Sequence, residues 1–205
     1  MSEMDRNVVH ESLSLLGELL AERRVRPLHL IVSGGSALLA AEITSRTTRD
    51  VDVIAFRGEI DDDILDAYPL PEFLKECAGE VAREERLQPG WLNASTAMLM
   101  IDLRRFPADF LSNLTERNYG EWLRVSFIGR AGLIYLKLYA AVERNEARDL
   151  DDLRALAPNA IEAERTARWL VSGEIISKSD TPRLLELLRK LDHDDLVPRI
   201  KALTE

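Results

Sequence analysis

The chain of 205 residues contains one cysteine, three histidines and few aromatic residues. A single cysteine, Cys77, excludes a disulfide within the chain. One cysteine and three scattered histidines also fail to supply the ligands of a structural zinc site. Such cysteine usage is typical of a reducing compartment, so we expect a cytoplasmic location.

Long apolar runs are also missing. The longest, such as residues 97–101, are far too short to cross a bilayer, and the first nine residues lack the apolar core of a signal peptide. Positive charge is in deficit, with 27 Lys and Arg against 36 Asp and Glu and a formal net charge of −9. We therefore expect no membrane partner, and nucleic acid could bind only through a local basic patch.

The apolar content of 46% is enough for one sizeable core, or for a core with a smaller helical appendage. Helical periodicity predicts helices over residues 7–23, 71–87, 130–145, 148–156, 160–171 and 182–191. Apolar or alternating runs predict strands over residues 28–33, 50–56 and 122–128. Residues 97–103 fit either a strand or a buried helix.

The order of these elements favours an α/β (α+β) fold, with a small mixed β-sheet flanked by helices and a helical C-terminal region. We expect the sheet-bearing core to span residues 1–128 and the helical region residues 129–205. An Ala- and Leu-rich segment over residues 36–43 predicts a further helix, with Ser36 as its N-cap.

A pair of glycines stands where the first predicted strand ends. Gly34 and Gly35 follow that strand directly, and Ser36 opens the next helix. The free backbone N–H groups of such a turn, the helix dipole and the serine hydroxyl all favour a phosphate group. An ordinary strand–helix turn can have the same sequence, so the glycine turn alone does not decide between the two.

Two carboxylates begin the second predicted strand. Asp50 and Asp52 are two residues apart, so a strand would place them on one side with Cβ atoms roughly 6 to 7 Å apart. Carboxylates at this spacing can converge on one Mg²⁺ or share two ions, as phosphoryl transfer requires. The alternative is a strand end in solvent, whose acids pair with Arg46 or Arg49.

Taken together, these motifs resemble the signature of the nucleotidyltransferase superfamily, Gly34-Gly35-Ser36 followed by Arg46-x-Thr48-x-Asp50-x-Asp52. A second block resembles the helical Lys…Arg-Asp…Asp motif of its AbiEii-like and MenA-like group, in the segments Leu136–Ala141, Arg144, Arg148-Asp149 and Asp152-Leu153. That group is known from bacterial toxin–antitoxin and abortive-infection systems. The resemblance covers about residues 30–155.

The resemblance implies a role for each matching residue. Asp50 and Asp52 would bind the catalytic metal, Mg²⁺ or Mn²⁺. The triphosphate of an NTP would contact Gly34, Gly35 and Ser36, and the further nucleotide-binding residues would be Arg46 and Thr48. Lys137 would reach a phosphate or the nucleotide, and Asp149 and Asp152 would complete or brace the catalytic site.

The predicted helix over residues 130–145 carries a basic stripe. Arg130, Lys137 and Arg144 are seven residues apart, so they nearly align along a helix, with a drift of about 20° per step. In an acidic protein this stripe could bind a triphosphate or an RNA backbone. The alternative is a solvated outer face of the helix.

A third carboxylate stands on a following strand in many polymerase-like members of the superfamily. The predicted strand over residues 122–128 offers Arg124 and Ser126 but no acid. Asp102, Asp149 or Asp152 could supply it. The gap leaves open whether one or two metal ions bind, and whether the protein is catalytic.

The sequence thus predicts a metal-dependent nucleotidyltransferase of the EC 2.7.7 type, which moves a nucleotide from an NTP to an acceptor hydroxyl and releases pyrophosphate. The acceptor would be RNA, such as tRNA, or protein. The alternative is a non-catalytic module that keeps the fold and binds a nucleotide or a partner. Because members of the group are often toxins, the resemblance also implies a toxin role with a cognate antitoxin protein as partner.

Overall fold

The computed structural model describes residues 3–58, 63–99 and 105–204. The chain forms two compact units: a sheet unit, Met1–Met100 with Asn113–Gly129, and a helical unit, Ile101–Ser112 with Arg130–Glu205. The predicted candidate acid Asp102 lies outside the described residues. In the described segments, no helix combines the length and the apolar character that crossing a membrane takes.

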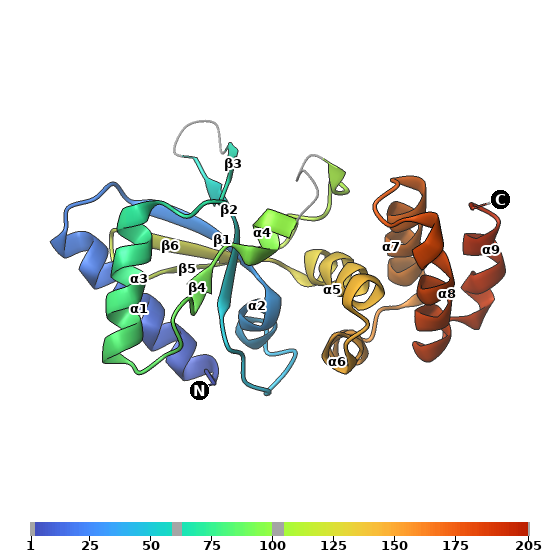
Figure 1. The fold of residues 1–205 in the computed structure, drawn as a ribbon, viewed down its shortest axis with the longest axis horizontal. Helices are drawn as coiled ribbons and strands as arrows, with labels where there is room; N and C mark the ends of the chain where they lie inside the picture. Colours follow the sequence, from blue (N-terminus) through green and yellow to red (C-terminus); the bar gives the residue numbers. More distant parts are fainter. Residues whose placement is uncertain (1–2, 59–62, 100–104, 205) are drawn as a thin grey trace. The chain divides into compact units, whose positions relative to one another are not determined.

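The sheet unit is built on a mixed sheet, which Figure 1 shows from one side. Its strands are β1 (Leu28–Ser33), β2 (Val51–Arg57), β3 (Ile64–Asp66), β4 (Leu92–Asn93), β5 (Thr115–Asn118) and β6 (Leu123–Phe127). They follow the order β3-β2-β1-β6-β5, and β4 pairs with β2 off this path. β1 is parallel to β6, β4 is parallel to β2, and the other pairs are antiparallel.

The helices of the sheet unit are α1 (Arg6–Glu22), α2 (Gly34–Ala40), α3 (Glu72–Glu84) and α4 (Ser95–Leu99). Asp5 caps α1 by accepting a hydrogen bond from the backbone N–H of Val8. Helices α1 and α3 contact each other, and α1 also contacts β6. A β-carbon at Gly17 would lie 2.0 Å from the carbonyl oxygen of Tyr119, so a glycine is what lets α1 approach the β5–β6 hairpin this closely.

The two faces of β1 differ in character. Successive side chains of a strand point to opposite faces, so one face of β1 has Leu28, Leu30 and Val32 and the other has His29, Ile31 and Ser33.

The register between β1 and β2 shifts between Ile31 and Val32, so that Ile54 of β2 has no direct partner. A shift of one residue moves the following side chains to the other face. Beyond this irregularity Asp52 lies opposite Ser33.

The helical unit contains α5 (Arg130–Arg144), α6 (Ala147–Leu156), α7 (Ala160–Ser172), α8 (Thr181–Lys190) and α9 (Val197–Lys201), with short 3-10 turns at Lys178–Asp180 and Asp194–Leu196. Its core is a cluster of aliphatic side chains, among them Leu138, Leu153, Leu170 and Leu188. Residues 105–112 of this unit pack onto α7 through Phe106, whose ring centroid lies 4.8 Å from that of Trp169.

Local sequence explains where these helices begin and end. Asn159 and Glu162 form a capping box at the start of α7. Helix α6 ends at Leu156 and is followed by its C-cap, Ala157, which adopts the left-handed conformation at φ 44°. A proline in the first turn of α8 costs no hydrogen bond, because the first N–H groups of a helix have no partner within it.

The predicted fold class is confirmed: a mixed sheet is flanked by helices and followed by a helical C-terminal region. Two details of the prediction are wrong. Ser36 is not an N-cap, because the helix already begins at Gly34 and Ser33 holds the cap position. The second strand begins at Val51, so Asp50 precedes it. The predicted division of the chain at residues 128 and 129 stays a prediction.

Candidate functional site

The end of β1 and the start of β2 bring the glycine turn and one acid together. Asp52 is the register partner of Ser33, the residue before Gly34. Gly34 adopts a φ of +74°, and a β-carbon there would lie 2.5 Å from Oδ2 of Asp52. The carboxylate therefore occupies the space that any other residue at position 34 would fill. The pairing of β1 with β2 thus brings the glycine turn and Asp52 together.

The other acid of the pair lies at the entrance to β2. Asp50 is half-buried, and its carbonyl oxygen accepts a hydrogen bond of 3.2 Å from the hydroxyl of Thr48. Thr48 is itself buried, and its backbone bonds to Met4 in both directions. Thr48 thus fixes the chain that leads into the Asp50–Asp52 pair. The guanidinium of half-buried Arg46 donates to the carbonyl of Thr47.

Gly35 and Ser36 are buried within the first turn of α2. The Ser36 hydroxyl donates a hydrogen bond of 3.0 Å to the carbonyl oxygen of Ser33. The hydroxyl therefore ties the end of β1 to the start of α2. The first backbone N–H groups of a helix have no acceptor inside it, so those at the start of α2 are the hydrogen-bond donors that could bind a phosphate at this turn.

A residue that the sequence did not single out also contacts the acid pair. The hydroxyl of Thr96, in α4, donates a hydrogen bond of 3.2 Å to Oδ1 of Asp52. On β4, Asn93 is the register partner of Asp52. Thr96 belongs to none of the sequence motifs, so its contact with Asp52 is evident only from the pairing of β4 with β2.

The second block of predicted residues forms one buried cluster in the helical unit. The Lys137 ammonium lies 2.7 Å from a carboxylate oxygen of Asp152 and 3.4 Å from one of Asp149. Arg144 also pairs with Asp149, at 3.0 Å. Lys137, Asp149 and Asp152 are each at most 8% exposed. The structure thus brings Lys137, Asp149 and Asp152 together, with two positive and two negative charges in the cluster.

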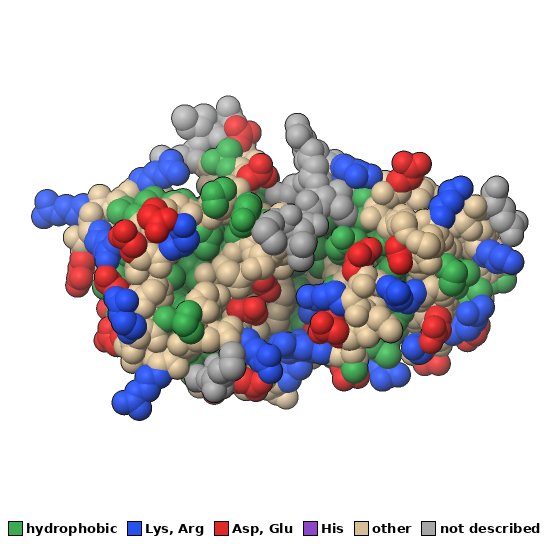
Figure 2. Space-filling model, viewed as in Figure 1, with side chains coloured by type: hydrophobic (Ala, Val, Ile, Leu, Met, Phe, Trp, Pro, Cys, Tyr) green, Lys and Arg blue, Asp and Glu red, His purple; other side chains and the backbone are tan. Residues whose placement is uncertain are grey.

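All three members of the predicted basic stripe have acidic partners. Arg130 pairs with Glu162 at 3.0 Å and donates to the carbonyl of Ala157. Lys137 and Arg144 pair with the aspartates described above. Figure 2 shows positive and negative side chains interspersed over the visible face of this unit. Carboxylates of the helical unit therefore offset the positive charges of the basic stripe.

The model of a family described as a nucleotidyltransferase of unknown function (DUF6036) matches residues 11–158. The chain belongs to this family. No curated protein and no solved structure matches the chain. This match confirms the nucleotidyltransferase superfamily that the sequence motifs suggested. The matched region includes both blocks of motif residues in this nucleotidyltransferase-family chain.

The acid pair of this family member suits a metal ion that is shared with a nucleotide. Among residues 3–58, 63–99 and 105–204, no group of three or more His, Cys, Asp or Glu is arranged to hold a metal ion. Mg²⁺ is normally bound by one or two carboxylates together with substrate phosphates and water, not by a cage of protein ligands. Asp52, whose carboxylate lies at the glycine turn, fits this pattern, and Asp50, two residues earlier, is the candidate for the second carboxylate.

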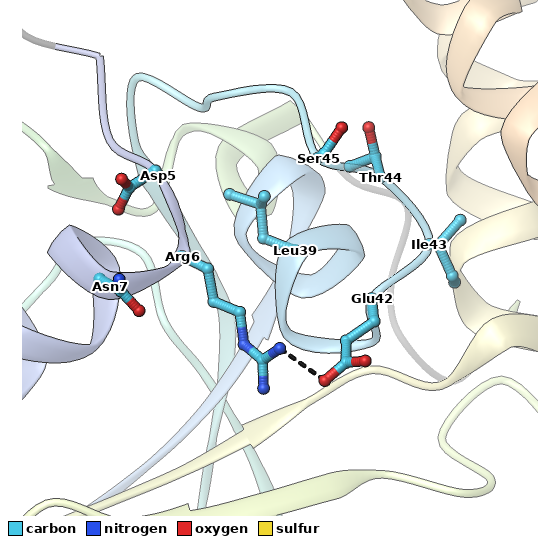
Figure 3. Close-up of a pocket in the computed structure, with 8 residues that line it drawn as sticks. All are labelled: Asp5, Arg6, Asn7, Leu39, Glu42, Ile43, Thr44 and Ser45. Atoms are coloured by element: carbon cyan, nitrogen blue, oxygen red, sulfur yellow. Dashed lines mark hydrogen bonds and ion pairs between the residues drawn. The ribbon is translucent and has the colours of Figure 1, made fainter.

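A pocket of about 570 Å³ lies elsewhere in the sheet unit, between the start of α1 and the end of α2 (Figure 3). Its lining residues are Asp5, Arg6, Asn7, Leu39, Glu42, Ile43, Thr44 and Ser45. Arg6 and Glu42 form an ion pair across it. The lining includes none of the predicted site residues, so this pocket is not the nucleotide site that the motifs indicate.

Proposed function

We propose that this nucleotidyltransferase-family protein transfers a nucleotide from an NTP to an acceptor hydroxyl, with Asp50 and Asp52 holding Mg²⁺ or Mn²⁺. The observation that carries the proposal is the contact between the Asp52 carboxylate and Gly34. It sets a metal-binding oxygen beside the backbone N–H groups that suit a phosphate. A metal–triphosphate complex needs both kinds of group at one point.

In the proposed reaction the acceptor oxygen bonds to the α-phosphorus of the NTP. The bond from that phosphorus to the oxygen bridging to the β-phosphate breaks, and pyrophosphate leaves. The acceptor gives up its proton to solvent or to a carboxylate of the acid pair. A metal ion held by Asp50 and Asp52 would supply positive charge to offset the charge of the reacting phosphate. The turn at Gly34 and Gly35 orients the β- and γ-phosphates through backbone N–H groups, and Ser36 fixes the turn itself.

The roles of the helical cluster follow the sequence resemblance. Lys137 would offset negative charge on the nucleotide, and Asp149 and Asp152 would hold its ammonium group. The distances within the cluster support the second part, because both aspartates lie within 3.4 Å of the Lys137 nitrogen. These two contacts give the Lys137 side chain a fixed position within the helical unit.

The proposal is tested by measuring binding of ATP, CTP, GTP and UTP, with and without Mg²⁺, to wild type, Asp50→Asn and Asp52→Asn. Wild type is expected to bind at least one NTP in an Mg²⁺-dependent way, and both variants are expected to lose that binding. Asp66→Asn is the matched control, because Asp66 is an exposed acid on β3 of the same sheet. Mg²⁺-dependent binding that survives in Asp52→Asn would overturn the proposal.

Turnover is measured separately, as pyrophosphate release with total RNA or total protein as acceptor. Release by wild type that Asp52→Asn lacks supports an enzyme and shows the acceptor class. The second candidate function is a module that binds the nucleotide without turnover. The absence of a third acid beside the pair, within the described residues, favours this candidate. NTP binding without pyrophosphate release for either acceptor class would establish it.

The AbiEii-like and MenA-like assignment stays a prediction of the sequence resemblance, as do the toxin role, the antitoxin partner and the cytoplasmic location. Growth arrest on expression, relieved by Asp52→Asn and by a protein encoded beside this one, would support the toxin role. Harmless expression of a protein that is active in the transfer assay would contradict it.

A further inference from the structure

The turn between β4 and α4 lies next to the acid pair and is organised by Asn93. The side-chain oxygen of Asn93 accepts a hydrogen bond of 2.8 Å from the backbone N–H of Ser95, and its amide donates to the carbonyl of Gly90 at 3.3 Å. An asparagine that bonds to the backbone two residues later fixes a tight turn. Since Asn93 is the register partner of Asp52, α4 begins directly beside the acid pair.

The start of α4 then places a hydroxyl on Asp52. Thr96 is half-buried in the first turn of α4, and its Oγ1 lies 3.2 Å from Oδ1 of Asp52. The other oxygen, Oδ2, is the one that faces Gly34. A hydrogen bond to one oxygen restricts the rotation of a carboxylate about its Cβ–Cγ bond. The two oxygens of Asp52 therefore have different neighbours: the Thr96 hydroxyl lies at Oδ1, and Gly34 lies at Oδ2.

We propose that Thr96 is a positioning residue for the transfer reaction, which holds Asp52 so that Oδ2 meets the metal–triphosphate complex at the Gly34 turn. This inference rests on the proposed function. Thr96 acts through Asp52 and does not itself touch the substrate. Asn93 has the supporting role, because the turn that it fixes determines where the Thr96 hydroxyl lies.

The test compares Thr96→Val, which keeps the shape but loses the hydroxyl, with Thr96→Ser, which keeps the hydroxyl. The readouts are the affinity for the NTP that wild type binds most tightly and the Mg²⁺ concentration that gives half-maximal binding. Thr96→Val is expected to weaken Mg²⁺-dependent NTP binding about tenfold and to raise the Mg²⁺ midpoint, because it removes a hydrogen bond to a charged group. Thr96→Ser is expected to stay within about a factor of two of wild type.

Thr115→Val is the matched control, since Thr115 is an exposed threonine on β5 of the same sheet. It should leave both readouts unchanged. Equal affinity and equal Mg²⁺ midpoint in Thr96→Val and wild type would overturn the inference while the proposed function stands. A loss in Thr96→Ser as large as that in Thr96→Val would also overturn it, because the effect would then not depend on the hydroxyl.

A double-mutant cycle separates this inference from the proposed function. The unfolding free energies of wild type, Thr96→Val, Asp52→Asn and the double variant give the coupling between the two side chains without any nucleotide. A coupling energy of zero would show that the Thr96 and Asp52 side chains do not interact, and it would overturn the inference. Clear coupling, with a wild type that binds no NTP, would overturn the proposed function and leave Thr96 with a structural role only.

Discussion

The carboxylate of Asp52 lies so close to the α-carbon of Gly34 that a β-carbon at residue 34 would come within 2.5 Å of Oδ2. The atom that would be displaced is the end of a side chain and not the backbone. The fold can therefore accommodate an alanine at position 34 by moving the carboxylate. The proposed metal site cannot accommodate it in this way, because it requires the carboxylate at this place.

Gly34→Ala is expected to remain folded and to lose Mg²⁺-dependent NTP binding. Its stability should fall by about 1 to 2 kcal/mol, because residue 34 has a positive φ that alanine adopts only at a cost. Isothermal calorimetry with NTP and Mg²⁺ measures the binding, and urea unfolding measures the stability.

Gly90→Ala is the control for this prediction. Gly90 has a similar φ of +78°, but nothing lies within 4 Å of a β-carbon built there. It should show the same loss of stability with unchanged NTP binding. Equal NTP binding by Gly34→Ala and Gly90→Ala would show that the Asp52–Gly34 contact has no role in binding.

Much of the fold was predictable from the sequence because its signals are local. The apolar periodicity of a helix such as α5 and the apolar run of β1 lie within single segments. The two turn glycines and the Asp-x-Asp pattern are also local. Their meeting at one point follows once β1 and β2 are neighbours.

The features that depend on pairing between distant segments were not predictable. The register shift between Ile31 and Val32 determines which face Asp52 occupies, yet neither residue differs from its apolar neighbours. The contact from Thr96 depends on a two-residue strand, β4, pairing with β2. The ion pairs of Lys137 with Asp149 and Asp152 depend on how α6 folds back onto α5.

The start of α2 shows how a local rule can be overridden. Ser36 has the residue type of an N-cap, so the sequence predicted a helix start there. Gly34 adopts a positive φ, which glycine tolerates without steric cost, and the chain turns into the helix two residues earlier. The Ser36 hydroxyl then bonds back to the Ser33 carbonyl.

The stability of the sheet unit is expected to depend on pH through His10. The ring of His10 packs on Tyr119 and Phe127, and its Nε2 atom is buried without a hydrogen-bond partner among the described residues. Burial, with smaller contributions from Arg117 and Arg6, lowers the pKa of His10 below its ordinary value of 6.5. The folded state thus prefers the neutral ring.

The sign of the effect follows from this shift in pKa. Above pH 6.5, His10 is neutral in both states and its full contribution to stability is present. As the pH falls through 6.5, the unfolded chain takes up a proton that the folded chain does not, so the unfolding free energy falls. The decline ends below the lowered pKa of the folded state.

Urea unfolding at a series of pH values between 8 and about 5 measures this effect. His10→Gln should unfold with a shallower dependence on pH than wild type, while His193→Gln, in the helical unit, should leave the contribution of His10 in place. If wild type and His10→Gln show the same slope over this range, His10 does not carry the dependence.

The buried cluster of Lys137, Asp149 and Asp152 leads to a prediction that separates stability from function. Lys137→Met removes the ammonium group from two buried carboxylates, and Oδ2 of Asp149 already has no hydrogen-bond partner within the described residues. Breaking a buried ion pair by removing one partner typically costs about 3 to 5 kcal/mol. We expect a loss of unfolding free energy of this order in the helical unit.

Lys190→Met is the matched control. Lys190 pairs with Glu186 one helical turn away, in an exposed i,i+4 pair of α8 that is worth at most about 0.5 kcal/mol. A double variant, Lys137→Met with Asp152→Asn, should recover part of the lost stability, because it also removes the charge of one carboxylate that has lost the Lys137 ammonium. Urea unfolding of the four proteins gives these differences. A Lys137→Met variant with wild-type stability but no NTP binding would show instead that the ammonium charge serves the nucleotide and that the aspartates do not depend on it.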